Sequence, residues 1–306
     1  MPKSIHQMLA AAYKAITVDD LGDSRLKPEQ AERFIRIVEK ESVLLGSARR
    51  LTMNADRRNI DRTGFSDRIL KAPQSEGEQF TDYETPDFFT NELIAVKARG
   101  AAWVSDEALE ENIERDNFEN TLVDMIASQA AIDLEELLLD GDTGDSDTFL
   151  ALTDGWLVTA EQQLDGSGDT DFAADDVEDM FDAMLEAVDE KYLRNLDDWR
   201  FDVTYSIEKA YREVLRTRET ALGDSAQTGS QQLAYEGVRL RRVPVMPSGT
   251  ARLSNRNNDV YGIRRDIEIE PERKADYDRW DFHVRVKADA HYEDENAAVT
   301  AVGFSG

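Results

Sequence analysis

The chain contains no cysteine among its 306 residues. This absence excludes disulfides, thiolate zinc sites, iron–sulfur clusters and a cysteine nucleophile. Histidine is scarce too: it occurs only at His6, His283 and His291, and no G-x-S-x-G turn accompanies them to indicate a serine triad. No P-loop or dinucleotide-binding glycine motif is present. We therefore expect a non-enzymatic protein without a cofactor.

Long hydrophobic runs are also missing. No apolar run reaches the ~18–20 residues that cross a bilayer. The N-terminal stretch has Lys3 and a short apolar run, but acids follow soon after and no convincing cleavage site appears. We expect a soluble protein, made in the cytoplasm, that contacts no membrane.

Lysine is rare in a chain dominated by acids. There are 64 acidic and 36 basic residues, which gives a net charge of −28, and arginine supplies most of the basic residues. Guanidinium is more weakly hydrated than ammonium, and in molar salt screening over roughly 3 Å removes self-repulsion. The balance favours a halophilic source over an ordinary acidic protein. It argues against a general nucleic-acid-binding surface, which needs a basic footprint.

Hydrophobic periodicity predicts helices first and strands last, an α+β arrangement. Residues 1–50 have helical spacing, and residues 51–86 lose it around Pro73, Gly77 and Pro86. A long helix is expected over about 117–139. Its apolar positions recur at three- and four-residue steps, at Phe118, Leu122, Met125, Ile126, Ala130, Leu134, Leu137 and Leu138.

Later elements follow the same logic. An amphipathic helix is expected over 177–188, and a helix capped by Ser206 should follow a strand over 201–205. Strands are expected over 238–246, 261–269, 282–288 and 297–302.

The pattern of residues 51–86 predicts an extended loop or a long hairpin with little core of its own, and the segment 62–92 is the part that would be held extended. Ordering a backbone costs about 1–2 kcal/mol per residue, so a lone chain gains little by holding it extended. Loops of this length in compact domains are normally functional. We expect this one to lie on a neighbouring subunit.

Several segments, taken in order, resemble a known family. They are the Ala101–Glu107 strand-to-helix entry, the helix ending at Leu139-Asp-Gly-Asp142, the Asp154-Gly-Trp156 turn, and the stretches 199–216, 237–247 and 285–302. Their order and spacing resemble the major capsid proteins of tailed viruses of the Hong Kong 97 type. No single one of these motifs is specific.

The resemblance implies an N-terminal arm over 1–50 and an extended E-loop with flanking strands over 51–98. It implies a peripheral domain over 99–155 and 251–295, with the spine helix at about 117–139. It also implies an axial domain over 156–250 and 296–306. Pentamers and hexamers would close into an icosahedral shell around double-stranded DNA, with scaffolding, portal and decoration proteins as further partners.

Together with the acidity, the resemblance indicates a tailed virus of a salt-loving archaeon, with the protein assembled in the host cytoplasm into the virion capsid. A cellular nanocompartment shell of the encapsulin kind and an acidic divalent-ion-binding surface protein stay open as alternatives. A hydrolase is disfavoured because no nucleophile or metal set is present. Arginines make the first 60 residues less acidic than the rest, and we expect that region to lie nearest the DNA.

One acidic loop partly mimics a calcium site. Asp165, Asp169, Asp171 and Asp176 fall within the span of a twelve-residue calcium loop, but Thr170 stands where glycine is required and the last ligand is aspartate. They are weak candidates for structural calcium or magnesium, and a flexible acidic loop is the alternative. Lys71 and Asn296 could cross-link only if a matching local motif were present, and none is.

Overall fold

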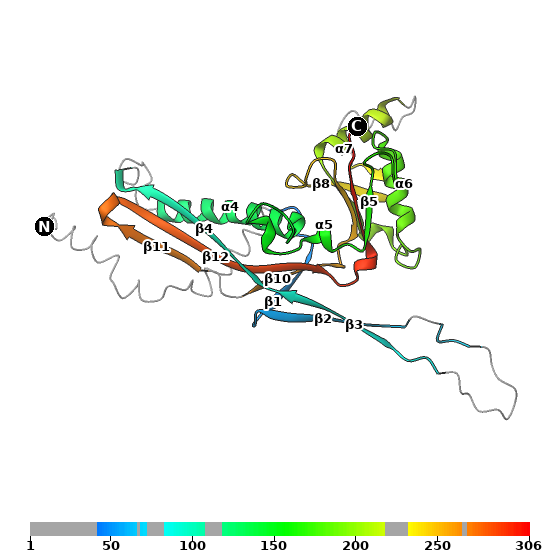
Figure 1. The fold of residues 1–306 in the computed structure, drawn as a ribbon, viewed down its shortest axis with the longest axis horizontal. Helices are drawn as coiled ribbons and strands as arrows, with labels where there is room; N and C mark the ends of the chain where they lie inside the picture. Colours follow the sequence, from blue (N-terminus) through cyan, green and yellow to red (C-terminus); the bar gives the residue numbers. More distant parts are fainter. Residues whose placement is uncertain (1–41, 66–67, 72–82, 108–117, 218–231, 265–267) are drawn as a thin grey trace, which may run out of the picture.

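The computed structural model describes residues 42–65, 68–71, 83–107, 118–217, 232–264 and 268–306. Of the helical stretch expected over 1–50, residues 1–41 lie outside the described residues. The rest of that expectation is wrong, because turns occupy residues 43–47 and a strand that pairs with a distant segment begins at Arg49. The described part contains two large sheets with helices packed on them and a projecting two-stranded hairpin (Figure 1). No helix in these ranges is long and apolar enough to cross a membrane.

A five-stranded sheet is organised around one long strand, β12 (Arg279–Tyr292). β12 pairs antiparallel with β4 (Val96–Ser105), β10 (Asp259–Arg264) and β11 (Glu268–Lys274), and β1 (Arg49–Met53) pairs parallel with β10. The long helix α4 (Phe118–Asp140) lies along one face of this sheet (Figure 1). Leu134 and Leu138 of α4 share one core with Tyr261, Val286 and Ala288.

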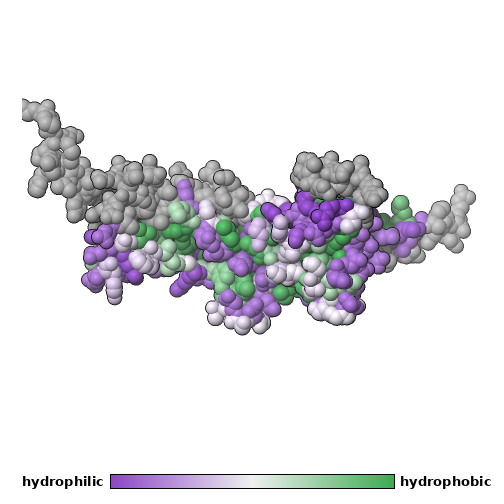
Figure 2. All heavy atoms as spheres, turned by 90° about the horizontal axis from the view of Figure 1, so that it is seen from above, coloured by the Kyte–Doolittle hydropathy of each residue, from purple (hydrophilic) through white to green (hydrophobic). Residues whose placement is uncertain are grey.

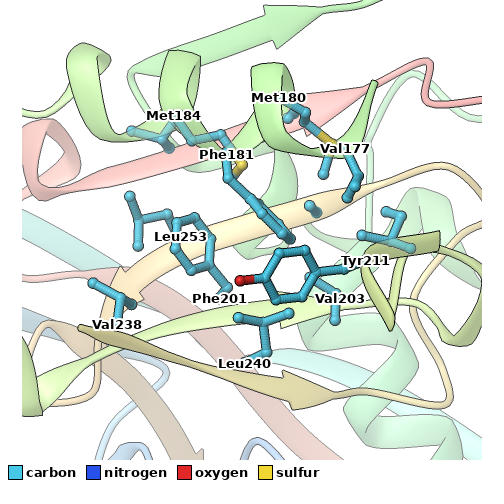
Figure 3. Packing of buried hydrophobic residues seen from close by; sticks show 14 of the residues in the cluster. Val177, Met180, Phe181, Met184, Phe201, Val203, Tyr211, Val238, Leu240 and Leu253 are labelled. Carbon is cyan, nitrogen blue, oxygen red and sulfur yellow. The ribbon is translucent and has the colours of Figure 1, made fainter. Parts of the chain in front are cut away.

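A six-stranded sheet forms the second body. Its order is β5 (Gln162–Asp165), β13 (Ala298–Val302), β9 (Ala251–Asn255), β6 (Trp199–Val203), β8 (Val238–Arg242) and β7 (Ala234–Tyr235). Helices α6 (Val177–Ala187) and α7 (Tyr205–Thr217) pack on one face. Figure 3 shows Phe181 of α6, Phe201 of β6 and Tyr211 of α7 meeting there, and the Phe181 and Phe201 ring centroids are 4.6 Å apart.

The third sheet is a hairpin of β2 (Arg57–Gly64) and β3 (Asp87–Ile94). It projects away from both larger sheets (Figure 1). Among the described residues of the hairpin, only the base has a core, in which Ile60 and Leu93 pack with Met53 and Val260.

The long periodic elements appear where the sequence predicts them. The helix expected over about 117–139 is α4, and the stripe of α6 buries Val177, Met180, Phe181 and Met184. Two glycines let the end of α4 pack closely on the chain that follows. A Cβ at Gly141 would lie 2.2 Å from the Thr153 carbonyl oxygen, and one at Gly155 would lie 2.6 Å from that of Leu139.

Several expected details are wrong. Met125 was expected in the core, but 64% of it is exposed on the outer side of α4. The strand expected over 238–246 ends at Arg242, because Pro244 has no N–H to continue the ladder. Helix α7 begins at Tyr205, so Thr204 and not Ser206 precedes it, and the Thr204 Oγ1 accepts from the Ile207 amide at 3.5 Å.

Other strands are longer than expected or absent from the prediction. β12 runs from Arg279 to Tyr292 where 282–288 was expected, and β5 and β9 were not expected at all. Residues 251–255, which the expected boundaries place with the peripheral domain, form β9 inside the six-stranded sheet. The Ala251–Asn255 segment lacks strict alternation, because its residues are buried on both faces or nearly so.

Candidate assembly surfaces

The base of the β2–β3 hairpin is tied to the five-stranded sheet. The Asn91 amide donates to the Tyr292 carbonyl oxygen at 2.9 Å, and the Ile94 N–H donates to the Asp289 carboxylate at 2.6 Å. Asp56, in the turn before β2, pairs with both Arg264 and Lys287. These contacts fix where the hairpin leaves the body of the protein.

The outer half of the hairpin has apolar side chains in solvent. Phe88 is 76% exposed and Tyr83 is 73% exposed. Leu70, Ile69 and Phe65 are likewise exposed. Isolated two-stranded ribbons are marginal in water, and contiguous exposed apolar side chains mark interaction sites. The hairpin therefore presents a surface suited to burial against another molecule.

A second exposed aromatic cluster lies beside the turn that joins β11 to β12. The Arg279 guanidinium lies 5.4 Å from the Trp103 ring centroid and 5.2 Å from that of Tyr277. Trp103 is 62% exposed and Tyr277 is 71% exposed. Tryptophan, tyrosine and arginine are the residue types enriched at binding hot spots.

The outer face of β4 and β12 concentrates positive charge in an otherwise acidic protein. Lys97 lies opposite Lys287, and Arg99 lies opposite Arg285. Like charges directly opposite each other destabilise a sheet. Lys287 pairs with Asp56 and Arg285 with Glu270, whereas no ion pair is seen for Lys97 or Arg99 within the described ranges. Seen from above, the molecule as a whole presents both hydrophilic and hydrophobic residues (Figure 2).

A buried charge network fills the junction between the two large sheets. Asp202 of β6 binds Arg252 of β9 at 2.7 Å and Arg241 of β8 at 2.6 Å, and Arg252 also binds Asp259 of β10 at 2.9 Å. Burial acts to raise the pKa of Asp202, but Arg241 and Arg252 outweigh it and hold that pKa below its ordinary value. Burial raises the pKa of Asp259. These buried ion pairs therefore fix how the two large sheets meet.

The same network reaches the chain before β1. Arg241 donates to the Val43 carbonyl oxygen at 3.2 Å, and the Leu44 N–H donates to the carboxylate of Glu135 on α4 at 2.6 Å. Burial raises the pKa of Glu135. Residues 42–48 are therefore anchored between α4 and the six-stranded sheet.

The four candidate metal ligands do not converge. Asp171 accepts from the Asp165 N–H at 2.8 Å, Asp165 accepts from the Ser167 N–H at 2.7 Å, and Asp169 accepts from the Ala174 N–H at 2.9 Å. Asp176 caps α6. Across the part of the chain that is described, no three histidine, aspartate or glutamate side chains are grouped to hold a metal ion. A cation in this loop stays a prediction.

The remaining candidates have ordinary partners. His283 lies 3.9 Å from Glu272, and His291 lies 3.5 Å from Glu295. Lys71 pairs with Glu84 at 2.6 Å. Of the N-terminal arginines, Arg49 pairs with Glu293 and Arg57 with Glu92, while Arg25, Arg33 and Arg36 lie outside the described residues.

Sequence reasoning missed the two aromatic surfaces and the charge network. The adjacent aromatics Phe88 and Phe89 were a usable signal, because neighbouring residues of a strand point to opposite faces and one had to be exposed on a thin hairpin. Asp202 carried no such signal, since a polar residue between Phe201 and Val203 reads as facing solvent.

Comparison with known proteins identifies this arrangement. No family model matches the chain. The chain is 32% identical over 291 residues to a Bacillus subtilis (strain 168) protein named "Putative prophage capsid protein YqbE", covering 90% of this chain and 92% of that protein. The chain belongs to this family of prophage capsid proteins. The expectation of a major capsid protein is confirmed.

Solved structures share its fold. The capsid protein matches a chain of the "Satellite phage P4 procapsid including size determination (Sid) protein" with a TM-score of 0.67 and 14% identity, covering 99% of this chain and 98% of that one. A capsid chain of an empty GTA particle matches with a TM-score of 0.62 and 15% identity over 87% and 90% of the two chains. A Mycobacterium phage Bobi chain matches at 0.58 and 12%, over 85% and 90%. The mixed helix-and-sheet fold of phage capsids is thereby shown.

Proposed function

We propose that this capsid protein is the non-enzymatic shell subunit of a tailed virus of the Hong Kong 97 type. Its pentamers and hexamers close into an icosahedral shell around double-stranded DNA. In this proposal the β2–β3 hairpin is the E-loop, α4 is the spine helix, and the five- and six-stranded sheets are the cores of the peripheral and axial domains. Residues 1–50 are the N-terminal arm.

The observation that carries the proposal is the exposed apolar half of the hairpin. Phe88 and Tyr83 lie on a ribbon that projects from the body, and the hairpin's small core lies entirely at its base. A monomer gains nothing by ordering such a ribbon. A neighbouring copy that buries Phe88 removes apolar surface from water, at about 25 cal/mol per Å².

Another copy of the chain is the partner that fits. The matched structures are described as an assembled procapsid and as GTA capsids. A hairpin on one copy that meets a different surface on the next makes a heterologous contact, and contacts of this type generate rings when the rotation between successive copies closes. The Trp103–Tyr277–Arg279 cluster supplies a second surface at a distance from the hairpin.

Substitution at Phe88 tests this assignment. We expect Phe88→Glu to abolish or strongly reduce shell formation, because a charge would have to be buried at the contact. The assembled fraction is measured by electron microscopy and sedimentation in molar salt. Phe88→Leu is the matched control, since it keeps an apolar side chain and should still assemble.

Circular dichroism shows whether both Phe88 variants keep the fold of the subunit. The side chain is exposed, so neither change should affect folding. Shells formed by Phe88→Glu in wild-type yield would remove the hairpin from the assembly contact.

Two alternatives have distinct outcomes. A cellular nanocompartment would enclose an enzyme where a virus shell encloses DNA, and the prophage relative supports the virus. An acidic divalent-ion-binding protein would bind calcium at the Asp165–Asp176 loop, which calorimetric titration in high salt detects as heat. We retain a haloarchaeal host and assembly in the host cytoplasm as proposals, and we propose no cation for the capsid protein at that loop.

Further partners are proposed by the same analogy. Scaffolding, portal and decoration proteins would act with the shell, and the inward surface would meet DNA without sequence readout. The acidic composition supports weak, local DNA contacts by arginines and not a continuous basic lining.

A further inference from the structure

The chain crosses between the two large sheets at two turns that are bonded to each other. One turn, residues 256–258, joins β9 to β10, and the other, residues 293–297, joins β12 to β13. The side chain of Asn258, in the first turn, bonds both backbone groups of Asp294 in the second turn. Its side-chain amide donates to the Asp294 carbonyl oxygen at 2.8 Å, and its side-chain oxygen accepts from the Asp294 N–H at 2.7 Å.

The Asp294 side chain collects contacts from three parts of the protein. The residue is 6% exposed. Its carboxylate accepts from the Tyr192 hydroxyl, in the turn after α6, at 2.7 Å, and from the Asn296 amides at 3.3 Å. It also forms an ion pair with Arg62 of β2. The β2–β3 hairpin, the six-stranded sheet with its helices, and the crossing between the sheets therefore meet at one carboxylate.

Arg62 links this carboxylate to both strands of the hairpin. It belongs to β2, and its guanidinium lies 4.5 Å from the centroid of the Phe89 ring of β3. Arg62 and Phe89 also line a cleft of about 460 Å³, together with Glu186, Tyr192 and Asn296. Open space therefore lies between the hairpin and the turn after α6, and Arg62, which lines it, reaches the Asp294 carboxylate.

We propose that Asp294 is a positioning residue that couples the tilt of the β2–β3 hairpin to the angle between the two large sheets. Movement of the 293–297 crossing shifts the Asp294 carboxylate, and the charge-assisted contact carries Arg62 and the hairpin with it. The value of this coupling to a shell rests on the proposed function of the hairpin. The coupling itself belongs to the single subunit.

Distance measurements between spin labels test the coupling, and the cysteine-free chain allows clean labelling. One label is placed by Thr63→Cys on β2 and the other by Glu213→Cys on α7, both at exposed positions. In the unassembled wild-type subunit we expect one narrow distance distribution. Asp294→Asn should broaden it and shift its mean, because the ion pair with Arg62 is lost.

Arg62→Gln should reproduce that change, and the double variant should add nothing, since both substitutions remove the same contact. Arg57→Gln is the matched control. Its ion pair with Glu92 joins the two strands of the same hairpin and never reaches Asp294, so the distribution should stay narrow. Should Asp294→Asn fail to fold, the partly exposed Arg62 carries the test alone.

A distribution unchanged in both Asp294→Asn and Arg62→Gln would overturn the coupling. The proposed function fails differently. Its test is loss of shells in Phe88→Glu, a change at the hairpin's exposed half that should leave the label distances of the free subunit as in wild type.

Discussion

At the scale of single residues, Asp202 shows how a surface-like sequence position becomes buried. Its neighbours Phe201 and Val203 face α6 and α7, and Asp202 faces the other large sheet. The alternation correctly predicts a strand, but the expectation that Asp202 faces solvent is wrong. The sequence could not reveal that the polar face is covered, because Arg252, which binds Asp202, lies 50 residues further along the chain.

We expect Asp202→Ala to lower the free energy of unfolding by about 3–5 kcal/mol, because it leaves Arg241 and Arg252 without their shared partner in the interior. Urea unfolding of the unassembled subunit measures the change. Glu213→Ala is the control: its pair with Lys209 is solvent-exposed and 3.9 Å long, so its loss should cost less than about 1 kcal/mol. Equal effects for the two variants would contradict a network that specifies the junction.

At the scale of elements, the end of α4 combines a strong sequence signal with an unfavourable charge. Burial and, after it, repulsion by Glu136, Asp145 and Asp142 together raise the pKa of Asp140 to about 6. Negative charge is also disfavoured at a helix C-terminus. The ionised form of Asp140 therefore costs stability, and the protonated form does not.

The sign of the pH dependence follows. The folded protein holds its proton up to about 6, whereas the unfolded chain releases it near 3.8. Between these values the folded state binds more protons, so stability falls as pH rises through this window. In Asp140→Asn we expect the melting temperature to depend less on pH within this window. We also expect the melting temperature of the variant to be higher than that of the wild type at neutral pH. An unchanged slope in the variant would show that Asp140 ionises without cost.

Elements with many periodic positions could be predicted from sequence, and short ones could not. α4 and α6 carry several turns of apolar spacing, so their existence follows from the pattern. β5 and β7 are four and two residues long. They are strands only because β13 and β8 lie beside them, and that pairing is a property of the folded chain.

At the scale of the whole molecule, the fold is predicted by the resemblance to the capsid family, and the acidity by the composition. Neither predicts which strands belong to which sheet, because β9 and β10 are consecutive in the chain but belong to different sheets. The exposed surfaces depend on this division. They are exposed because the cores of the two large sheets and the small core at the base of the hairpin do not reach the outer half of the hairpin, or Trp103 and Tyr277 beside the start of β12.

The net charge of −28 makes the last prediction one about salt. Self-repulsion of the acids opposes the compact state, and molar salt shortens the screening length to roughly 3 Å. We expect the melting temperature of the unassembled subunit to rise steadily as potassium chloride is raised into the molar range. The exposed pairs such as Lys191–Asp189 weaken under the same conditions, but each contributes less than about 1 kcal/mol and the repulsion involves the whole surface.

Sucrose at matched osmolality is the control, because it stabilises by exclusion from the surface without screening charge. A melting temperature that rises equally in sucrose, or falls in salt, would show that the acidity is not an adaptation to high salt.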